Sequence, residues 1–153
     1  MTALICGSLA YDTVMVFNGR FKEHILPDRI HMLSVAFMVP ELRRNFGGCA
    51  GNIAYNLKLL GGDPLVAAAV GQDFDPYAAW MRKQGLSMDC VARHEDAYTA
   101  QAYITTDLDD NQITAFHPGA MERSKDIPVP RDRSLGIALI GPDGRESMID
   151  HAQ

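Results

Sequence analysis

The chain of 153 residues is most glycine-dense over residues 47–52 (GGCAGN), and these residues are the first candidates for binding chemistry. Glycines allow a backbone to approach a ligand closely and to adopt positive φ angles. Apolar residues recur at helical spacing over residues 53–60, so a helix is expected to begin directly after the glycines. Its free N–H groups would suit a hydroxyl-rich or anionic ligand, although a tight strand-to-helix turn without a ligand explains the same residues equally well.

Two common glycine motifs are excluded at this position. A Walker phosphate loop needs Gly-Lys-Ser/Thr after four spacer residues, and residues 47–52 contain no lysine. The dinucleotide pattern GxGxxG is also absent, and the glycines do not open a first βαβ unit. The cysteines at positions 6, 49 and 90 are odd in number and widely spaced, which excludes a disulfide framework, and they form no CxxC metal pair.

Composition narrows the class of partner. The formal net charge of −5 argues against nucleic acid and against an acidic membrane surface, because neither would attract this chain. No apolar run approaches the roughly 18 residues that cross a bilayer, and no signal peptide is visible at the N-terminus. Free cysteines fit a reducing compartment, so we expect a cytoplasmic protein.

The surrounding pattern predicts the elements that must position the glycine-rich residues. Asp73 or Asp75 is expected to cap the second predicted helix. Strand–helix alternation at both ends of the chain, with hairpin-like strands between, indicates an α/β core plus a separate small sheet. The predicted strands are 3–6, 12–17, 32–39, 65–70, a hairpin over 99–116 and a buried strand at Leu135–Ile140; the predicted helices are 53–60, 75–84 and one that begins at Arg145 and continues toward Gln153.

Three separated segments together resemble one enzyme family. Residues 47–54 (GGCAGNIA), with the glycines that follow at 61 and 71, are similar to the first signature of the ribokinase-like (PfkB) carbohydrate and nucleoside kinases. Residues 7–12 (GSLAYD) resemble that family's first strand, which ends in an aspartate. Residues 116–121 (FHPGAM) are nearest to the bacterial adenosine- and nucleoside-kinase-like branch. The resemblance covers essentially the whole chain.

This resemblance implies an α/β fold with a ribokinase-like, Rossmann-like core that is incomplete here, together with a small β-sheet lid. Residues 1–153 would form the N-terminal part of one such domain. The lid strands are expected near residues 12–18, 32–39 and 98–117.

The resemblance also implies roles for individual residues. Asp12 would accept hydrogen bonds from two sugar hydroxyls, and Asn52 would bind another hydroxyl. An aspartate that caps a turn and an asparagine that caps a helix are the alternatives. Gly47 and Gly48 would offer backbone and clearance, whereas Ser8 is a weaker candidate that a turn explains equally well.

Further candidates lie in the lid and after the last predicted strand. Phe116, Gln101 and Tyr103 could cover the substrate, with Phe116 forming an apolar slot for a base, although ordinary sheet packing explains their alternation better. Asp143 follows the predicted strand at Leu135–Ile140, where some relatives place an acidic substrate contact, but Gly-Pro-Asp-Gly is also a common turn.

The family's catalytic signature, Gly-Ala-Gly-Asp, does not occur in these residues. No catalytic, cofactor-binding or metal-binding residue is therefore assigned, and the ATP and magnesium that the family uses would bind elsewhere. We expect the substrate-binding half of an ATP-dependent kinase for a hydroxymethyl group of a sugar or an adenosine- or ribose-like nucleoside, inactive by itself. The alternatives are a non-catalytic sugar- or nucleoside-binding module and a structural remnant that dimerises through the lid sheet. For the kinase half too, the edge of the lid sheet offers a surface for a homodimer.

Overall fold

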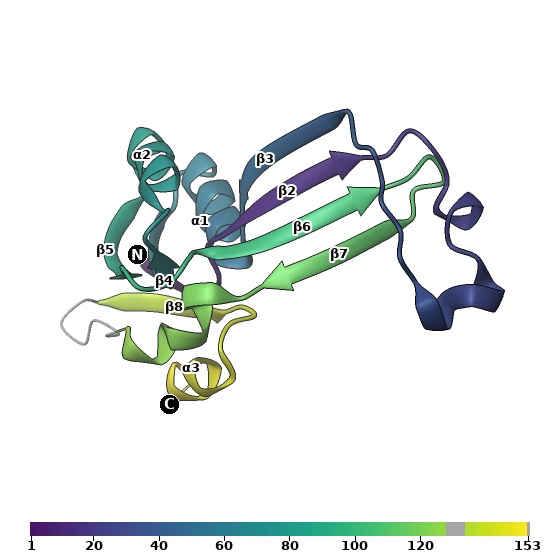
Figure 1. The fold of residues 1–153 in the computed structure, drawn as a ribbon. Coiled ribbons are helices and arrows are strands. Elements are labelled where there is room, and N and C mark those ends of the chain that lie inside the picture. Colours follow the sequence, from purple (N-terminus) through teal and green to yellow (C-terminus); the bar gives the residue numbers. More distant parts are fainter. Residues whose placement is uncertain (128–133, 153) are drawn as a thin grey trace.

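The computed structural model describes residues 1–127 and 134–152, which form two separate four-stranded sheets (Figure 1). The first, called the core sheet, is parallel throughout and has the strand order β5-β4-β1-β8. The second sheet has the order β3-β2-β6-β7 and mixes parallel and antiparallel pairs. The predicted fold class, an α/β core with a separate small sheet, is confirmed.

The core sheet is built from β1 (Thr2–Cys6), β4 (Asp63–Gly71), β5 (Ser87–His94) and β8 (Leu135–Ile140). Every residue of β4 after Asp63 is buried, as expected for a parallel strand covered on both faces. Helices α1 (Cys49–Leu59) and α2 (Asp75–Lys83) cover one face. The 3-10 helix η3 (Gly119–Asp126) covers the other face, and α3 (Arg145–Asp150) packs beside η3.

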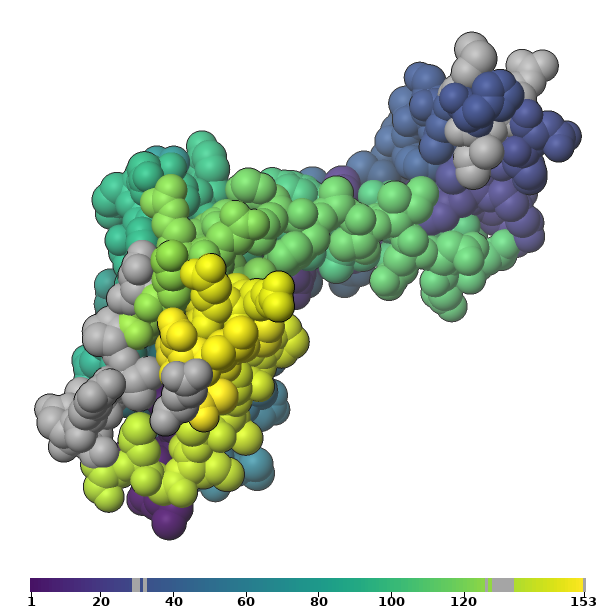
Figure 2. Space-filling view, turned by 90° about the horizontal axis from the view of Figure 1, so that it is seen from below, coloured from purple at the N-terminus to yellow at the C-terminus, as the bar shows by residue number. Residues whose placement is uncertain are grey.

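The second sheet comprises β2 (Ala10–Val16), β3 (Glu41–Gly47), β6 (Ala100–Thr106) and β7 (Gln112–His117). It extends away from the core sheet as a narrow arm (Figures 1 and 2). The short 3-10 helices η1 (Phe21–Glu23) and η2 (Pro27–Met32) lie at the far end of this arm.

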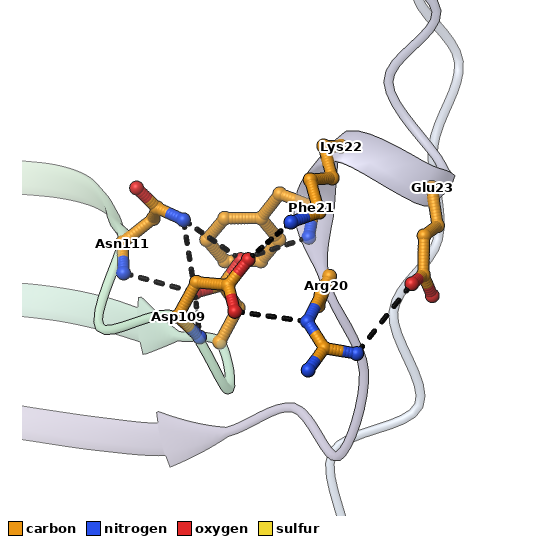
Figure 3. Close-up of polar contacts among 7 residues, drawn as sticks. Arg20, Phe21, Lys22, Glu23, Asp109 and Asn111 are labelled. Carbon is orange, nitrogen blue, oxygen red and sulfur yellow. Dashed lines mark hydrogen bonds and ion pairs between the residues drawn. The ribbon is translucent and has the colours of Figure 1, made fainter.

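The far end of the arm is held by the carboxylate of Asp107, which precedes the β6–β7 turn. It accepts hydrogen bonds from the backbone N–H groups of Phe21, Asp109 and Asn111, each at 2.9 Å. Arg20 and Lys22 each contact Asp109 at 2.8 Å (Figure 3). These contacts join the segment after β2 to the turn of the hairpin.

The predicted strand at 32–39 is wrong. Residues 33–39 have no regular structure, and the antiparallel partner of β2 is β3, which begins after Pro40. Phe37 instead packs against Phe17 and Phe21, so this segment contributes an aromatic ring to the packing at the far end of the arm. The side chains of Glu41–Asn45 are exposed on an edge strand, and a polar sequence of this kind carries no strand pattern.

Other differences have similar physical causes. Strand β8 forms where it was predicted but is not buried, and Ile137, for example, is 53 % exposed. The reason is that β8 lies at the edge of the core sheet. Neither Asp73 nor Asp75 caps α2, whose N-cap is Phe74 without a side-chain bond. Strand β5 and helix η3 were not predicted. Helix α3 begins at Arg145 as expected and ends at Asp150; Gln153 lies outside the described residues. No described helix is long and apolar enough to span a membrane.

Candidate functional site

Two connections between the sheets meet at the carboxyl end of β1. Residues 7–9 lead from β1 into β2, and Gly48 leads from β3 into α1. In α/β proteins ligands commonly bind in the crevice beyond the carboxyl ends of parallel strands. The glycine-rich residues and the aspartate singled out in the sequence therefore lie where such a site is expected.

Ser8 holds the N-terminus of α1. Its hydroxyl oxygen accepts a hydrogen bond from the N–H of Cys49 at 3.1 Å, and its carbonyl accepts one from Ala50 at 3.0 Å. Two N–H groups at the start of α1 are therefore already bonded, which corrects the expectation that these groups point freely toward a ligand. The structure favours the turn interpretation for Ser8.

Gly48 is required by backbone geometry. Its φ angle is +88°, a conformation that side chains disfavour, and a Cβ there would lie 2.7 Å from the backbone nitrogen of Ala10. Gly47 has a different constraint, because a Cβ there would collide with the carboxylate of Asp12. Gly47 thus provides the space that Asp12 occupies.

Asp12 lies on β2, paired with Asn45 of β3 and Ala102 of β6. It is half-buried, and burial raises the pKa of its carboxyl group above the ordinary value. Among the residues that the structure describes, no N–H or O–H group donates to this carboxylate. Since buried carboxylates are usually paired, Asp12 has unused capacity to accept hydrogen bonds.

Phe116 shares a row of the second sheet with Asp12. The register runs from Asn45 through Asp12 and Ala102 to Phe116, so all four side chains project from one face. At a strand spacing of about 4.8 Å, Asp12 and Phe116 are roughly 10 Å apart, with only the small Ala102 between them. Phe116 is 53 % exposed. This face, here called the Asp12 face, combines a carboxylate with an exposed aromatic ring.

Gln101 and Tyr103 lie on the opposite face of the same sheet. Each is displaced by one residue from Ala102, and neighbouring residues of a strand project to opposite sides. The Tyr103 hydroxyl donates to Oε1 of Gln101 at 2.8 Å, while Nε2 of Gln101 donates to Asp73 at 3.2 Å. These contacts favour the packing interpretation for both residues.

Asn52 lies inside the first turn of α1, because the N-cap is Gly48, so the capping alternative is wrong. Its side chain is exposed and lines an open groove of about 390 Å³ between α1 and β8, together with Leu57 and Leu139. No described contact joins Asn52 to Asp12, so the site residues divide between the core and the second sheet.

Asp143 lies in the turn after β8 and is half-buried. Its Oδ1 accepts from the N–H of Gly144 at 2.9 Å, while its Oδ2 is buried and has no partner within residues 1–127 and 134–152. Burial raises the pKa of this carboxyl group. The Cys49 thiol donates to the carbonyl of Pro142 at 3.3 Å, which brings the turn beside the N-terminus of α1.

Two residues that bond to the second sheet were not recognised in the sequence. The Tyr77 hydroxyl donates to the carbonyl of Gly47 at 2.8 Å, and its pKa is raised by burial and by the charge of Asp12. The position of Tyr77 in the predicted helix at 75–84 can indicate which side of that helix it is on, but not the group to which its hydroxyl bonds. Asp73 was interpreted as a helix cap, and instead contacts the second sheet. No group of three His, Cys, Asp or Glu side chains suited to a metal ion occurs among the described residues.

The sequence of this chain is similar to a known protein family and to two kinases of that kind. The model of the pfkB family carbohydrate kinases matches residues 12–135. A nucleoside kinase of Methanothermobacter thermautotrophicus is 32 % identical over 123 residues, which cover 79 % of this chain and 40 % of that protein. A nucleoside kinase of Methanocaldococcus jannaschii is 31 % identical over 99 residues, covering 63 % of this chain and 33 % of that protein.

The chain is also similar to the solved structure of a nucleoside kinase, at a higher sequence identity. The Burkholderia thailandensis nucleoside kinase in complex with inosine has a TM-score of 0.83 and 51 % identity, over 97 % of this chain and 47 % of that one. The same kinase in complex with ADP-inosine has a TM-score of 0.77 and 53 % identity, over 97 % of this chain and 47 % of that one. The chain thus spans less than half the length of these relatives.

Proposed function

Because the chain belongs to the pfkB family of carbohydrate kinases, we propose that it is the substrate-binding half of an ATP-dependent kinase that phosphorylates a hydroxymethyl group of a nucleoside. The single observation that carries this proposal is the carboxylate of Asp12, which is half-buried and accepts no hydrogen bond from the described residues. A carboxylate can accept from two vicinal hydroxyl groups, as a ribose ring presents them.

The Asp12 face supports a nucleoside over a free sugar. Phe116 lies two strands from Asp12 on the same face, with Ala102 between them. A ribose held at Asp12 would place its base toward Phe116, and aromatic rings stack on bases of any sequence. The inosine in the relative from Burkholderia thailandensis is a ligand of this class.

Phosphoryl transfer needs groups that the resemblance places outside residues 1–153. ATP is proposed as the phosphoryl donor on family grounds, and a 53 % identical relative was solved in complex with ADP-inosine. Magnesium is proposed on family grounds alone. Phosphoryl transfer depends on positioning and electrostatic stabilisation, so the chain without a base and an anion-stabilising segment should show no turnover. A coupled ADP-release assay with inosine, adenosine and ribose would detect any that exists.

The decisive experiment is calorimetric titration of the chain with inosine. Asp12→Asn keeps the size of the side chain but removes the charge, and should weaken binding by about 100-fold or more. Asp110→Asn, in the exposed turn of the same sheet, is the matched control and should bind normally. Equal affinity of Asp12→Asn and the unaltered chain would refute the proposed role.

We further propose a homodimer through the second sheet. All six residues of the edge strand β7 are exposed, and an unpaired strand edge can pair with another chain. Sedimentation of the chain at several concentrations tests this, since a monomer at every concentration is the contrary result. The three cysteines are free thiols, in keeping with a cytoplasmic location.

A further inference from the structure

The candidate site has parts on two bodies that must be held at a fixed angle. Asp12 and Phe116 lie on the second sheet, whereas Asn52 lies on a helix packed against the core sheet. The second sheet is a narrow arm that projects from the core (Figures 1 and 2). A ligand that contacts both bodies therefore depends on whatever fixes the base of the arm.

Asp73 makes several polar contacts at that base. It follows β4, the buried central strand of the core sheet, and its side chain is 20 % exposed. Its Oδ1 accepts from the backbone N–H of Thr99 at 2.8 Å, just before β6. Its Oδ2 accepts from Gln101 at 3.2 Å and lies 3.4 Å from the guanidinium of Arg44.

The backbone of Asp73 adds a contact to a third strand. Its carbonyl accepts from the Tyr11 hydroxyl at 2.8 Å, and the guanidinium of Arg44 lies 3.7 Å from the centre of the Tyr11 ring. One core residue therefore bonds to β2, β3 and β6. We call Asp73 with Tyr11, Arg44, Thr99 and Gln101 the Asp73 junction.

The junction is on the far side of the sheet from the candidate ligand. Tyr11 and Gln101 are paired, and each is one residue away from the row of Asp12 and Ala102. Arg44 is likewise next to Asn45, the partner of Asp12 in β3. Since neighbouring residues of a strand project to opposite faces, Asp73 acts on the ligand site only through the sheet.

We infer that Asp73 is a positioning residue, which sets the orientation of the second sheet, and thus of Asp12 and Phe116, relative to the core. The consequence for a ligand rests on the proposed function. An asparagine at this position could still accept from Thr99, but its amide nitrogen would then be a donor facing the guanidinium of Arg44. Asp73→Asn should therefore loosen the second sheet without removing any group that touches the ligand.

Residual dipolar couplings of the backbone amides of the 153-residue chain measure this orientation directly. In the unaltered chain, one alignment tensor should fit both sheets. In Asp73→Asn, the second sheet should require a separate tensor of smaller magnitude. Asp75→Asn is the matched control, because Asp75 lies two residues away and pairs with Arg93, a residue of the core sheet. It should leave the common tensor unchanged.

A second variant covers the case in which Asp73→Asn does not fold. Gln101→Met keeps the length of the side chain and removes one donor to Asp73, so it should produce a smaller change of the same kind. A common tensor for both sheets in whichever of the two variants folds would overturn the inference. A mere loss of global stability would lower the melting temperature without separating the tensors.

Inosine titration of the same samples separates this inference from the proposed function. Asp73→Asn should raise the Kd for inosine about tenfold, as expected for a misplaced but intact site, while Asp75→Asn should not change it. Separate tensors with an unchanged Kd would refute the positioning role. If the unaltered chain binds no nucleoside, the proposed function fails, while the tensors still decide whether Asp73 orients the sheet.

Discussion

The core sheet and the second sheet are stabilised in different ways. In the core sheet, the two faces of β4 pack into separate apolar clusters, so burial holds the strand on both sides. In the second sheet, β7 and most of β3 are exposed, and aromatic packing among the described residues is confined to the two ends of the arm, where polar contacts at Asp73 and Asp107 add to it. A domain can thus combine a core that is buried on both faces of its sheet with a thin arm whose geometry depends on a few contacts at its two ends.

The largest expected effect comes from testing burial in the two sheets with the same substitution. Ile5 in β1 is completely buried, whereas Ile113 in β7 is 44 % exposed. Ile5→Ala should lower the free energy of unfolding by about 2–5 kcal/mol. Ile113→Ala should change it by about 0.5 kcal/mol or less, as exposed sites do. Urea denaturation measures both, and similar losses would contradict the contrast between the sheets.

The next effect compares the two faces of the second sheet. Phe116→Ala should weaken inosine binding by about 1–3 kcal/mol through the lost stacking, but leave binding of ribose unchanged. Ile113→Ala, on the opposite face and outside the Asp73 junction, is the control and should alter neither. An equal loss for ribose would show that Phe116 does not contact a base, and a loss in Ile113→Ala would place the ligand on the other face.

A more local effect is expected at the far end of the arm. Asp107→Ala leaves three backbone N–H groups without their acceptor, so amide exchange at Phe21 and Asn111 should accelerate about tenfold or more. Exchange in β4 should not change, because the core sheet lies at the other end of the molecule. Asp109→Ala, which removes only exposed ion pairs with Arg20 and Lys22, should have little effect. Faster exchange throughout the chain would contradict independent behaviour of the arm.

Acidification should separate two aspartates of the same sheet. Desolvation raises the pKa of Asp107, but hydrogen bonds from backbone N–H groups and from the Asn111 side chain outweigh it and lower the pKa to about 2. Its contribution to stability is therefore complete above the unfolded-state pKa near 4 and lost as the pH falls toward 2. Burial raises the pKa of Asp12, so inosine affinity should decline at a higher pH, before the arm unfolds. Carbon-13 NMR titration of both carboxyl groups, with calorimetry, tests that order.

Local sequence was sufficient to predict an element when the residue pattern within that element alone indicates its structure. The all-apolar run at residues 65–70 predicted the strand that forms there as β4, and the glycines before α1 predicted a turn leading into a helix. The hairpin of β6 and β7 followed from alternation and a polar turn. The family resemblance rested on segments of this kind, and the match over residues 12–135 confirmed it.

Local sequence failed where an element depends on a partner distant in the chain. The polar strand β3 forms because β2 offers a complete ladder of backbone partners, while the apolar residues 33–39 have no such partner. Strand β8 is apolar yet exposed, since exposure depends on its position at the edge of the sheet.

The candidate site also has features that local sequence predicted and features that depend on contacts between distant residues. The residue types in GSLAYD and GGCAGN indicated a carboxylate, clearance and a helix start, all of which are properties of short segments. Only the tertiary structure decided that Phe116 shares a face with Asp12 while Gln101 does not, and that Asp73 bonds to the second sheet. Strand register and contacts between residues far apart in sequence arise from packing the whole chain, so no single segment encodes them.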